Sequence, residues 1–194
     1  MLFKRKNEFK PDKTEGDALS KLYITKKQRQ VILRWVLIAL VLMVFSVVQD
    51  VILSRLSIFG VTLNIVTSAL LLICVLQDSE IGSIFILVGS TVYWASGSTP
   101  GSYIIAILTV LGIFACILRQ AYLYNHAGSN LLCAGLAVMA YELILFVIGC
   151  FLGRTTLNHI TDTLIAGGLS FAVMPILYPI FKAISNIGGE SWKD

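Results

Sequence analysis

Six apolar runs, separated by short polar interruptions, make up most of the sequence beyond Arg34. In lipid, each run must satisfy its own backbone hydrogen bonds, which favours helices of about 20 residues. The composition agrees, because 57% of the residues are hydrophobic and only 13% are charged, against roughly 25% charged in soluble domains. A chain of this size has too little interior to hide so many apolar side chains from water. The sequence therefore predicts an all-α membrane protein.

The apolar runs predict a six-transmembrane-helix bundle that occupies residues 35–182. Several runs are shorter than about 20 residues, so they must thin the bilayer or include polar flanks. The second run either crosses the membrane fully or is re-entrant. The predicted spans are residues 35–48, 61–76, 81–95, 103–118, 130–152 and 164–181.

The first 34 residues carry ten Lys or Arg and four Asp or Glu, whereas the remaining 160 carry five basic and seven acidic residues. This asymmetry predicts a basic cytoplasmic tail over residues 1–34. The low overall share of charged residues, 13%, argues against a nucleic-acid-binding surface spread over the chain. The tail is either a topology signal or a contact for anionic lipid or the cytoskeleton. Residues 183–194 are predicted to form a short C-terminal tail.

An even number of spans places both termini on the same side of the membrane. With the basic tail inside, Arg119, Lys182 and Lys193 also fall inside, and only Arg55 and Arg154 fall outside. Thirteen basic residues inside against two outside is a strong positive-inside bias. We therefore expect a multi-pass protein of the cytoplasmic membrane with both termini in the cytoplasm.

Pairs of small residues recur at sevenfold spacing in and after the third predicted span. Positions seven apart return to nearly the same face of a helix, and small side chains there let another helix approach closely. The stripe is either an internal packing seam or a face for a partner. Its residues are Gly82, Ser83, Gly89, Ser90, Ser96 and Gly97.

Glu142 is the one acidic residue far from both ends of its apolar run. Because an ionised carboxylate is costly in hydrocarbon, Glu142 must be protonated, hydrogen-bonded or exposed to a wet cavity. It is a substrate contact, a proton site or a buried polar lock between helices. Asn64, Ser90 and Tyr93 are the candidate partners for a lock.

The sequence offers no motif for catalysis, metal binding or a cofactor. The cysteines lie inside apolar runs without CxxC or CxxH spacing, which is typical of small apolar core residues. His159 and Asp162 would share a helical face, but no GxSxG nucleophile motif accompanies them. We therefore expect a non-enzymatic protein. The four cysteines are Cys74, Cys116, Cys133 and Cys150.

The order of features resembles the rod-shape-determining MreD family. The loop after the first span begins with Gln49 and ends with the "I-x-G" sequence Ile58-Phe59-Gly60, as the family's first outer loop does. The family's third span typically ends in a "D-x-x-x-G-x-x-x-G" turn. Here Gly89, Gly97 and Gly101 match the spaced glycines, while Tyr93 replaces the usual acid and Leu63 replaces a common proline.

The resemblance covers about residues 31–182 and implies a non-enzymatic membrane subunit of the bacterial elongation machinery, which synthesises peptidoglycan along the cell. Its direct partner would be an MreC-like bitopic protein. Through this partner it would connect to MreB-like filaments and to the peptidoglycan polymerase and transpeptidase. No cofactor is implied.

MreD-like proteins are also similar in architecture to the substrate-binding subunits of energy-coupling-factor vitamin transporters. Those subunits are six-span proteins of comparable length that commonly carry an AxxxA face in the first span. The first span here contains only Ala39. A small-molecule binding subunit of a transporter is therefore the alternative function.

Overall fold

A computed structural model describes residues 26–187 except 56, 59, 78, 98, 100 and 123–125, so most of both predicted tails lies outside the described residues. The described chain forms six α-helices, two short 3-10 turns at Leu53–Arg55 and Leu157–His159, and one antiparallel hairpin. The helices and strands are α2 (Lys26–Val51), β1 (Ser57–Ile58), β2 (Val61–Thr62), α3 (Ile65–Leu76), α4 (Ser79–Ala95), α5 (Tyr103–Tyr122), α6 (Ala127–Phe151) and α7 (Ile160–Ser185).

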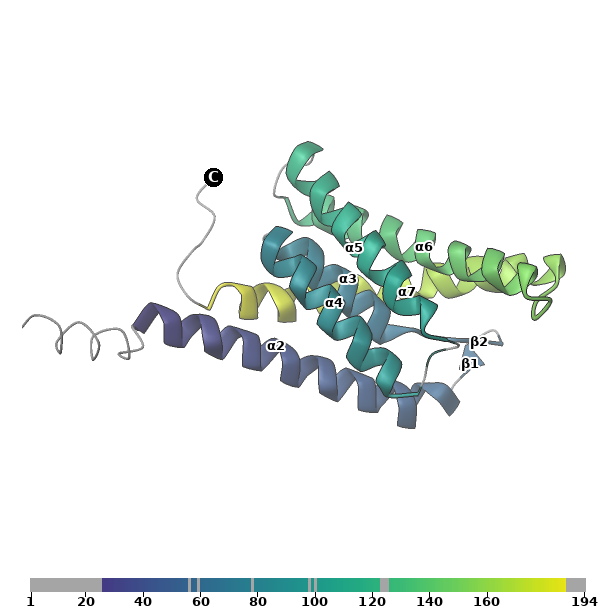
Figure 1. Ribbon diagram of the computed structural model, residues 1–194, viewed down its shortest axis with the longest axis horizontal. Helices are drawn as coiled ribbons and strands as arrows, with labels where there is room; N and C mark the ends of the chain where they lie inside the picture. Colours follow the sequence, from purple (N-terminus) through teal and green to yellow (C-terminus); the bar gives the residue numbers. More distant parts are fainter. Residues whose placement is uncertain are drawn as a thin grey trace, which may run out of the picture.

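The prediction of an almost entirely helical protein is confirmed (Figure 1). Among the described residues, four segments are long and apolar enough to cross a membrane: Arg29–Val51, Tyr103–Ala121, Ala127–Phe151 and Leu157–Ser185. The first of these helices begins at Lys26, so the last part of the predicted basic tail is helical and continuous with the first apolar run. The other two apolar helices, α3 and α4, are shorter.

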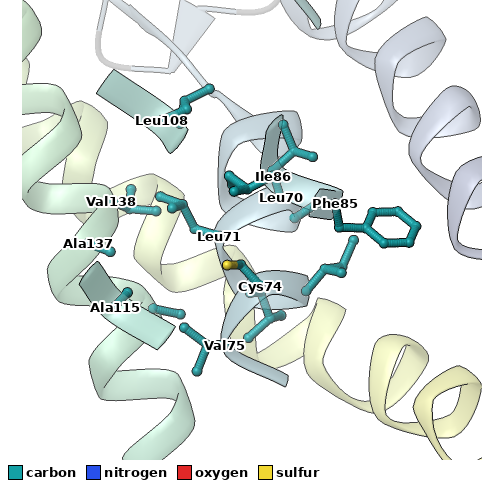
Figure 2. Close-up of a cluster of buried hydrophobic side chains, with 14 of the residues drawn as sticks. Leu70, Leu71, Cys74, Val75, Phe85, Ile86, Leu108, Ala115, Ala137 and Val138 are labelled. Atoms are coloured by element: carbon teal, nitrogen blue, oxygen red, sulfur yellow. The ribbon is translucent and has the colours of Figure 1, made fainter. Parts of the chain in front are cut away.

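The short helix α3 forms the centre of the bundle. It is apolar on all sides, and every residue from Val66 to Val75 is buried, as expected for a helix surrounded by protein. The five other helices that the structure describes all contact it. Figure 2 shows side chains of α3, among them Leu71 and Cys74, packed against side chains of α4, α5 and α6.

The predicted second span, residues 61–76, is not one continuous helix. Val61 and Thr62 form strand β2, and α3 begins at Ile65, after the N-cap Asn64. The Asn64 side chain accepts a hydrogen bond from the backbone N–H of Thr67 at 3.4 Å, which fixes the start of the helix at this point. The helix has 12 residues and is therefore only about 18 Å long.

The C-terminal end of α3 is held by two arginines. Arg119 of α5 is 6% exposed and donates hydrogen bonds to the carbonyl oxygens of Val75 and Gln77. Arg34 of α2 donates to the side-chain oxygen of Gln77 at 2.6 Å and to the carbonyl of Ser185, the last residue of α7, at 3.3 Å. The last carbonyls of a helix lack intrahelical partners and carry partial negative charge, so both arginines are favourable here.

These contacts define two ends of the bundle. At one, called the basic end, Arg34, Arg119 and the last turn of α7 with Lys182 surround the end of α3. At the other, called the hairpin end, strands β1 and β2 lie near the end of α2 and the loop after α6. The helices run back and forth between the two ends (Figure 1).

The predicted small-residue stripe packs partly inside the protein. A Cβ atom added to Gly82 would lie 2.9 Å from the carbonyl oxygen of Cys74, and one added to Gly89 would overlap the Leu70 side chain. Ser90 is buried and lies 3.4 Å from the Thr109 hydroxyl of α5. The helical part of the stripe therefore packs against α3 and α5, with Ser83 half-buried beside it.

The stripe does not continue as a helix to its last pair. Helix α4 ends at Ala95, and Ser96 and Gly97 lie in the following turn, where both are exposed. Gly97 has a φ of 80°, a left-handed conformation that glycine adopts without steric cost at a helix end. Of the six residues with sevenfold spacing, four therefore lie in α4, and two lie in the turn that ends this helix.

Candidate functional site

A cavity of about 800 Å³ lies at the hairpin end of the bundle. The end of α2, the hairpin with the chain up to Asn64, the end of α4, one face of α6 and the start of α7 all contribute to its walls. It therefore collects residues that are far apart in the sequence. Those that form its floor and charged wall are Gln49, Asp50, Asn64, Tyr93, Tyr141, Glu142, His159 and Asp162.

A chain of side-chain hydrogen bonds forms the floor of the cavity. Gln49 accepts a hydrogen bond from the backbone N–H of Val66 at 2.8 Å and donates through Nε2 to the Tyr93 hydroxyl at 3.0 Å. The Tyr93 hydroxyl in turn donates to Oδ1 of Asn64 at 3.1 Å. The network joins α2, α4 and the start of α3, and it satisfies a backbone donor that the helix itself leaves free.

Glu142 lines this cavity and is half-buried. None of the candidate lock partners Asn64, Ser90 and Tyr93 forms a hydrogen bond with it within the described residues; Asn64 and Tyr93 bind each other instead. Its neighbour Tyr141 also lines the cavity and is 1% exposed. The sequence allowed Glu142 to be protonated, hydrogen-bonded or exposed to a cavity. The structure places it beside a cavity.

His159 and Asp162 lie together at the start of α7, where they line the cavity. Nδ1 of His159 is 2.8 Å from Oδ2 of Asp162, and both side chains are more than half exposed. A carboxylate in the first turn of a helix is favoured by the helix dipole. The three-residue spacing therefore corresponds to a direct contact at a solvent-accessible part of the cavity wall.

The cysteines occupy the interior rather than the cavity. Cys74, Cys116 and Cys133 are buried on three different helices, and Cys150 is half-buried. The thiol of Cys74 lies 3.2 Å from the carbonyl oxygen of Gly112, as is usual for thiols that serve as small core residues. Within the described part of the chain, no group of His, Cys, Asp or Glu is arranged to hold a metal ion.

Sequence reasoning missed the convergence of Gln49, Asn64, Tyr93 and Tyr141. In the sequence, Gln49 enters only through the family resemblance, and no pattern marks Tyr141 as a site residue. A usable signal was present, because Gln49 and Asn64 are amides at the ends of two apolar runs that a short loop connects.

Comparisons of the chain with known protein families, characterised proteins and solved structures find no match.

Proposed function

We propose that this chain is a non-enzymatic, multi-pass subunit of the bacterial cell-elongation machinery and that it binds an MreC-like bitopic partner. One observation carries the proposal: residues from separate parts of the sequence resemblance line the same cavity. Gln49 and Gly60 come from the loop after α2, and Tyr93 and Gly97 come from the end of α4. Motif positions that meet at one site are typical of a binding function.

In this proposal, the basic end of the bundle faces the cytoplasm and the hairpin end faces outward. The orientation is supported by the distribution of basic residues in the described part of the chain. Arg34, Arg119 and Lys182 lie at the basic end, whereas Arg55 and Arg154 are the only basic side chains other than histidine that this part places near the hairpin. A bitopic partner that extends outward from the membrane would then meet the open cavity. The proposed contact is therefore between the cavity and the membrane-proximal part of that partner.

The second apolar segment is proposed to cross the membrane in two parts. Helix α3 alone spans about 18 Å of a hydrocarbon core about 30 Å thick. The hairpin Ser57–Thr62 and Asn64 continue its path at the cavity, where irregular backbone is tolerated because it is buried in protein or hydrated. Together with α4, this gives six crossings and places both termini in the cytoplasm.

Cysteine labelling tests this orientation. Ser96→Cys lies in the exposed turn at the hairpin end, and Gly128→Cys lies in the exposed first turn of α6 at the basic end. A membrane-impermeant maleimide should label Ser96→Cys in intact cells and Gly128→Cys only after permeabilisation. The unmodified chain, whose cysteines are buried or half-buried, is the control for background. Labelling of Gly128→Cys alone in intact cells would show that the orientation is reversed.

Depletion of the protein tests the function itself. We expect rod-shaped cells to become round as the protein is lost, because lateral peptidoglycan synthesis would lose an assembly subunit. Microscopy of depleted cells and copurification of the bitopic partner with the tagged chain are the two measurements. Depleted cells that keep their shape, with no partner recovered, would contradict the proposal.

The alternative is a substrate-binding subunit of a vitamin-type transporter. The specific observation in its favour is the cavity volume of about 800 Å³, which lies within the usual range of roughly 300–1,000 Å³ for small-molecule sites. Under this alternative, depletion should abolish uptake of one vitamin and leave cell shape unchanged. Measurement of shape and uptake in the same depleted cells separates the two functions.

A further inference from the structure

The charged residues of the helices are segregated between the two ends of the bundle. Of the four acidic residues in the described helices, only Glu80, at the start of α4, lies at the basic end. The other three, Asp50, Glu142 and Asp162, line the cavity. All six Lys and Arg of these helices lie at the basic end, which therefore carries a net positive charge: Lys26, Lys27, Arg29, Arg34, Arg119 and Lys182.

The ends of α2 and α7 bring two exposed cations to similar depths. Arg34 donates a hydrogen bond to the carbonyl of Ser185 at 3.3 Å, so these two residues lie at one level of the bundle. Arg29 precedes Arg34 on α2 and therefore lies about 7.5 Å farther out along the helix. Lys182 precedes Ser185 on α7 and lies about 4.5 Å deeper. Both side chains are exposed, and their flexible stems let the charged groups reach the same polar layer.

Aromatic residues mark this level as a boundary of the hydrocarbon core. Trp35 follows Arg34 and stacks on Phe85, with 4.6 Å between the ring centroids. Tyr178 lies one turn before Lys182, whose ammonium is 5.5 Å from the centre of the tyrosine ring. Both Trp35 and Tyr178 are half-buried. Because Trp and Tyr are enriched at the level of the lipid headgroups, the neighbouring cations lie at the depth of the lipid phosphates.

The two other arginines at this end are engaged within the protein. Arg34 is half-buried and donates to the side chain of Gln77 and to the carbonyl of Ser185. Arg119 is buried and donates to the carbonyls of Val75 and Gln77. Among the described side chains of the helices, the cations exposed toward lipid are therefore those at the ends of α2 and α7.

We propose that the basic end binds the headgroups of anionic phospholipids, with Arg29 and Lys182 contacting the lipid phosphates. Charge complementarity carries the choice of occupant, since guanidinium and ammonium groups form charge-assisted hydrogen bonds with phosphate oxygens. Each Lys or Arg near an anionic membrane surface strengthens association roughly fivefold. The inference does not depend on the proposed function, because it requires only that the apolar helices lie in a lipid bilayer.

Quenching of tryptophan fluorescence by brominated lipid measures which lipids lie beside this surface. The chain has three tryptophans, Trp35, Trp94 and Trp192. Trp35 lies at the basic end, and the exposed Trp94, near the end of α4, lies at the hairpin end. Replacement of the other two tryptophans by phenylalanine gives one full-length variant that retains only Trp35 and one that retains only Trp94. Each is reconstituted in mixed bilayers of phosphatidylglycerol and phosphatidylcholine, with one of the two lipids brominated.

Quenching of Trp35 should show phosphatidylglycerol binding at least about fivefold more tightly than phosphatidylcholine, and Trp94 should show a smaller preference. Arg29→Gln combined with Lys182→Gln should remove most of the preference at Trp35. Arg154→Gln, at an exposed arginine of the hairpin end, should leave it unchanged. Equal quenching of Trp35 by the two lipids, or an unchanged preference in the double variant, would overturn the inference. An equal preference at Trp94 would also overturn it, because the attraction would then not be confined to the basic end.

Discussion

Arg119→Met should prevent the protein from accumulating in folded form. The guanidinium group is 6% exposed and binds the carbonyl oxygens of Val75 and Gln77 at the buried end of α3. Methionine fills similar space but donates no hydrogen bond, so these acceptors would lose the arginine without gaining water. Hydrogen bonds from charged groups contribute about 1.5–3 kcal/mol each, so we expect a loss of about 3 kcal/mol or more. Thermal unfolding in detergent and the amount of full-length protein in membranes are the measurements.

Two control variants isolate this effect. Arg154→Met makes the same change at an exposed arginine after α6 and should leave the melting temperature unchanged. Arg119→Lys keeps the charge but has fewer donors in a different geometry, so its stability should fall between those of the unmodified protein and Arg119→Met. If Arg119→Met proves as stable as Arg154→Met, then the arginine does not hold the end of α3.

The second large effect is expected at the contact between α3 and α4. Gly82→Leu places a branched side chain where a Cβ atom alone would lie 2.9 Å from the backbone carbonyl oxygen of Cys74. A backbone atom cannot rotate away, so the two helices must separate. Overpacking of this kind costs about 1–3 kcal/mol, and separation of these helices would also expose Cys74 and other buried residues of α3. We expect degradation in cells and a lower melting temperature of any protein recovered.

Leucine substitutions at two other glycines serve as a control and a comparison for this prediction. Gly168 lies in α7 with open space around it, so Gly168→Leu tests the addition of leucine to a helix without a clash and should leave the protein stable. Gly89→Leu should destabilise less than Gly82→Leu, because its first clash is with the end of the flexible Leu70 side chain rather than with backbone. Normal accumulation of Gly82→Leu with loss of the partner would instead make this surface a partner face.

Both predictions concern how the other helices hold α3 in position. Helix α3 is buried along its length and ends inside the protein, so its position depends on groups that other helices supply. Arg119 and Arg34 hold its C-terminal end, while Gln49 and Asn64 hold its start beside the cavity. A change at the basic end can therefore disturb the cavity through the helix that joins them.

Much of the helical framework could be predicted from the sequence. The predicted and observed helices agree closely for the third and fourth apolar runs, which begin near Ile81 and at Tyr103. In lipid, the backbone groups of a long apolar run can be hydrogen-bonded within the run only if it is helical. Local composition therefore determines which segments form helices. The sequence predicts one span over the second run because β2 and α3 belong to the same largely apolar stretch. Where such a run changes from strand to helix depends on Asn64 and on the surrounding protein.

The sequence by itself determined the membrane class, the helix-forming segments and the unequal distribution of basic residues, because these follow from composition and local order along the chain. Only the tertiary structure decided that Gln49, Asn64 and Tyr93 form one network, that Glu142 and Tyr141 border a cavity, and that Arg119 holds a buried helix end. These contacts join residues as many as 44 positions apart. Their geometry depends on how the helices pack around α3, which no local pattern of residues specifies.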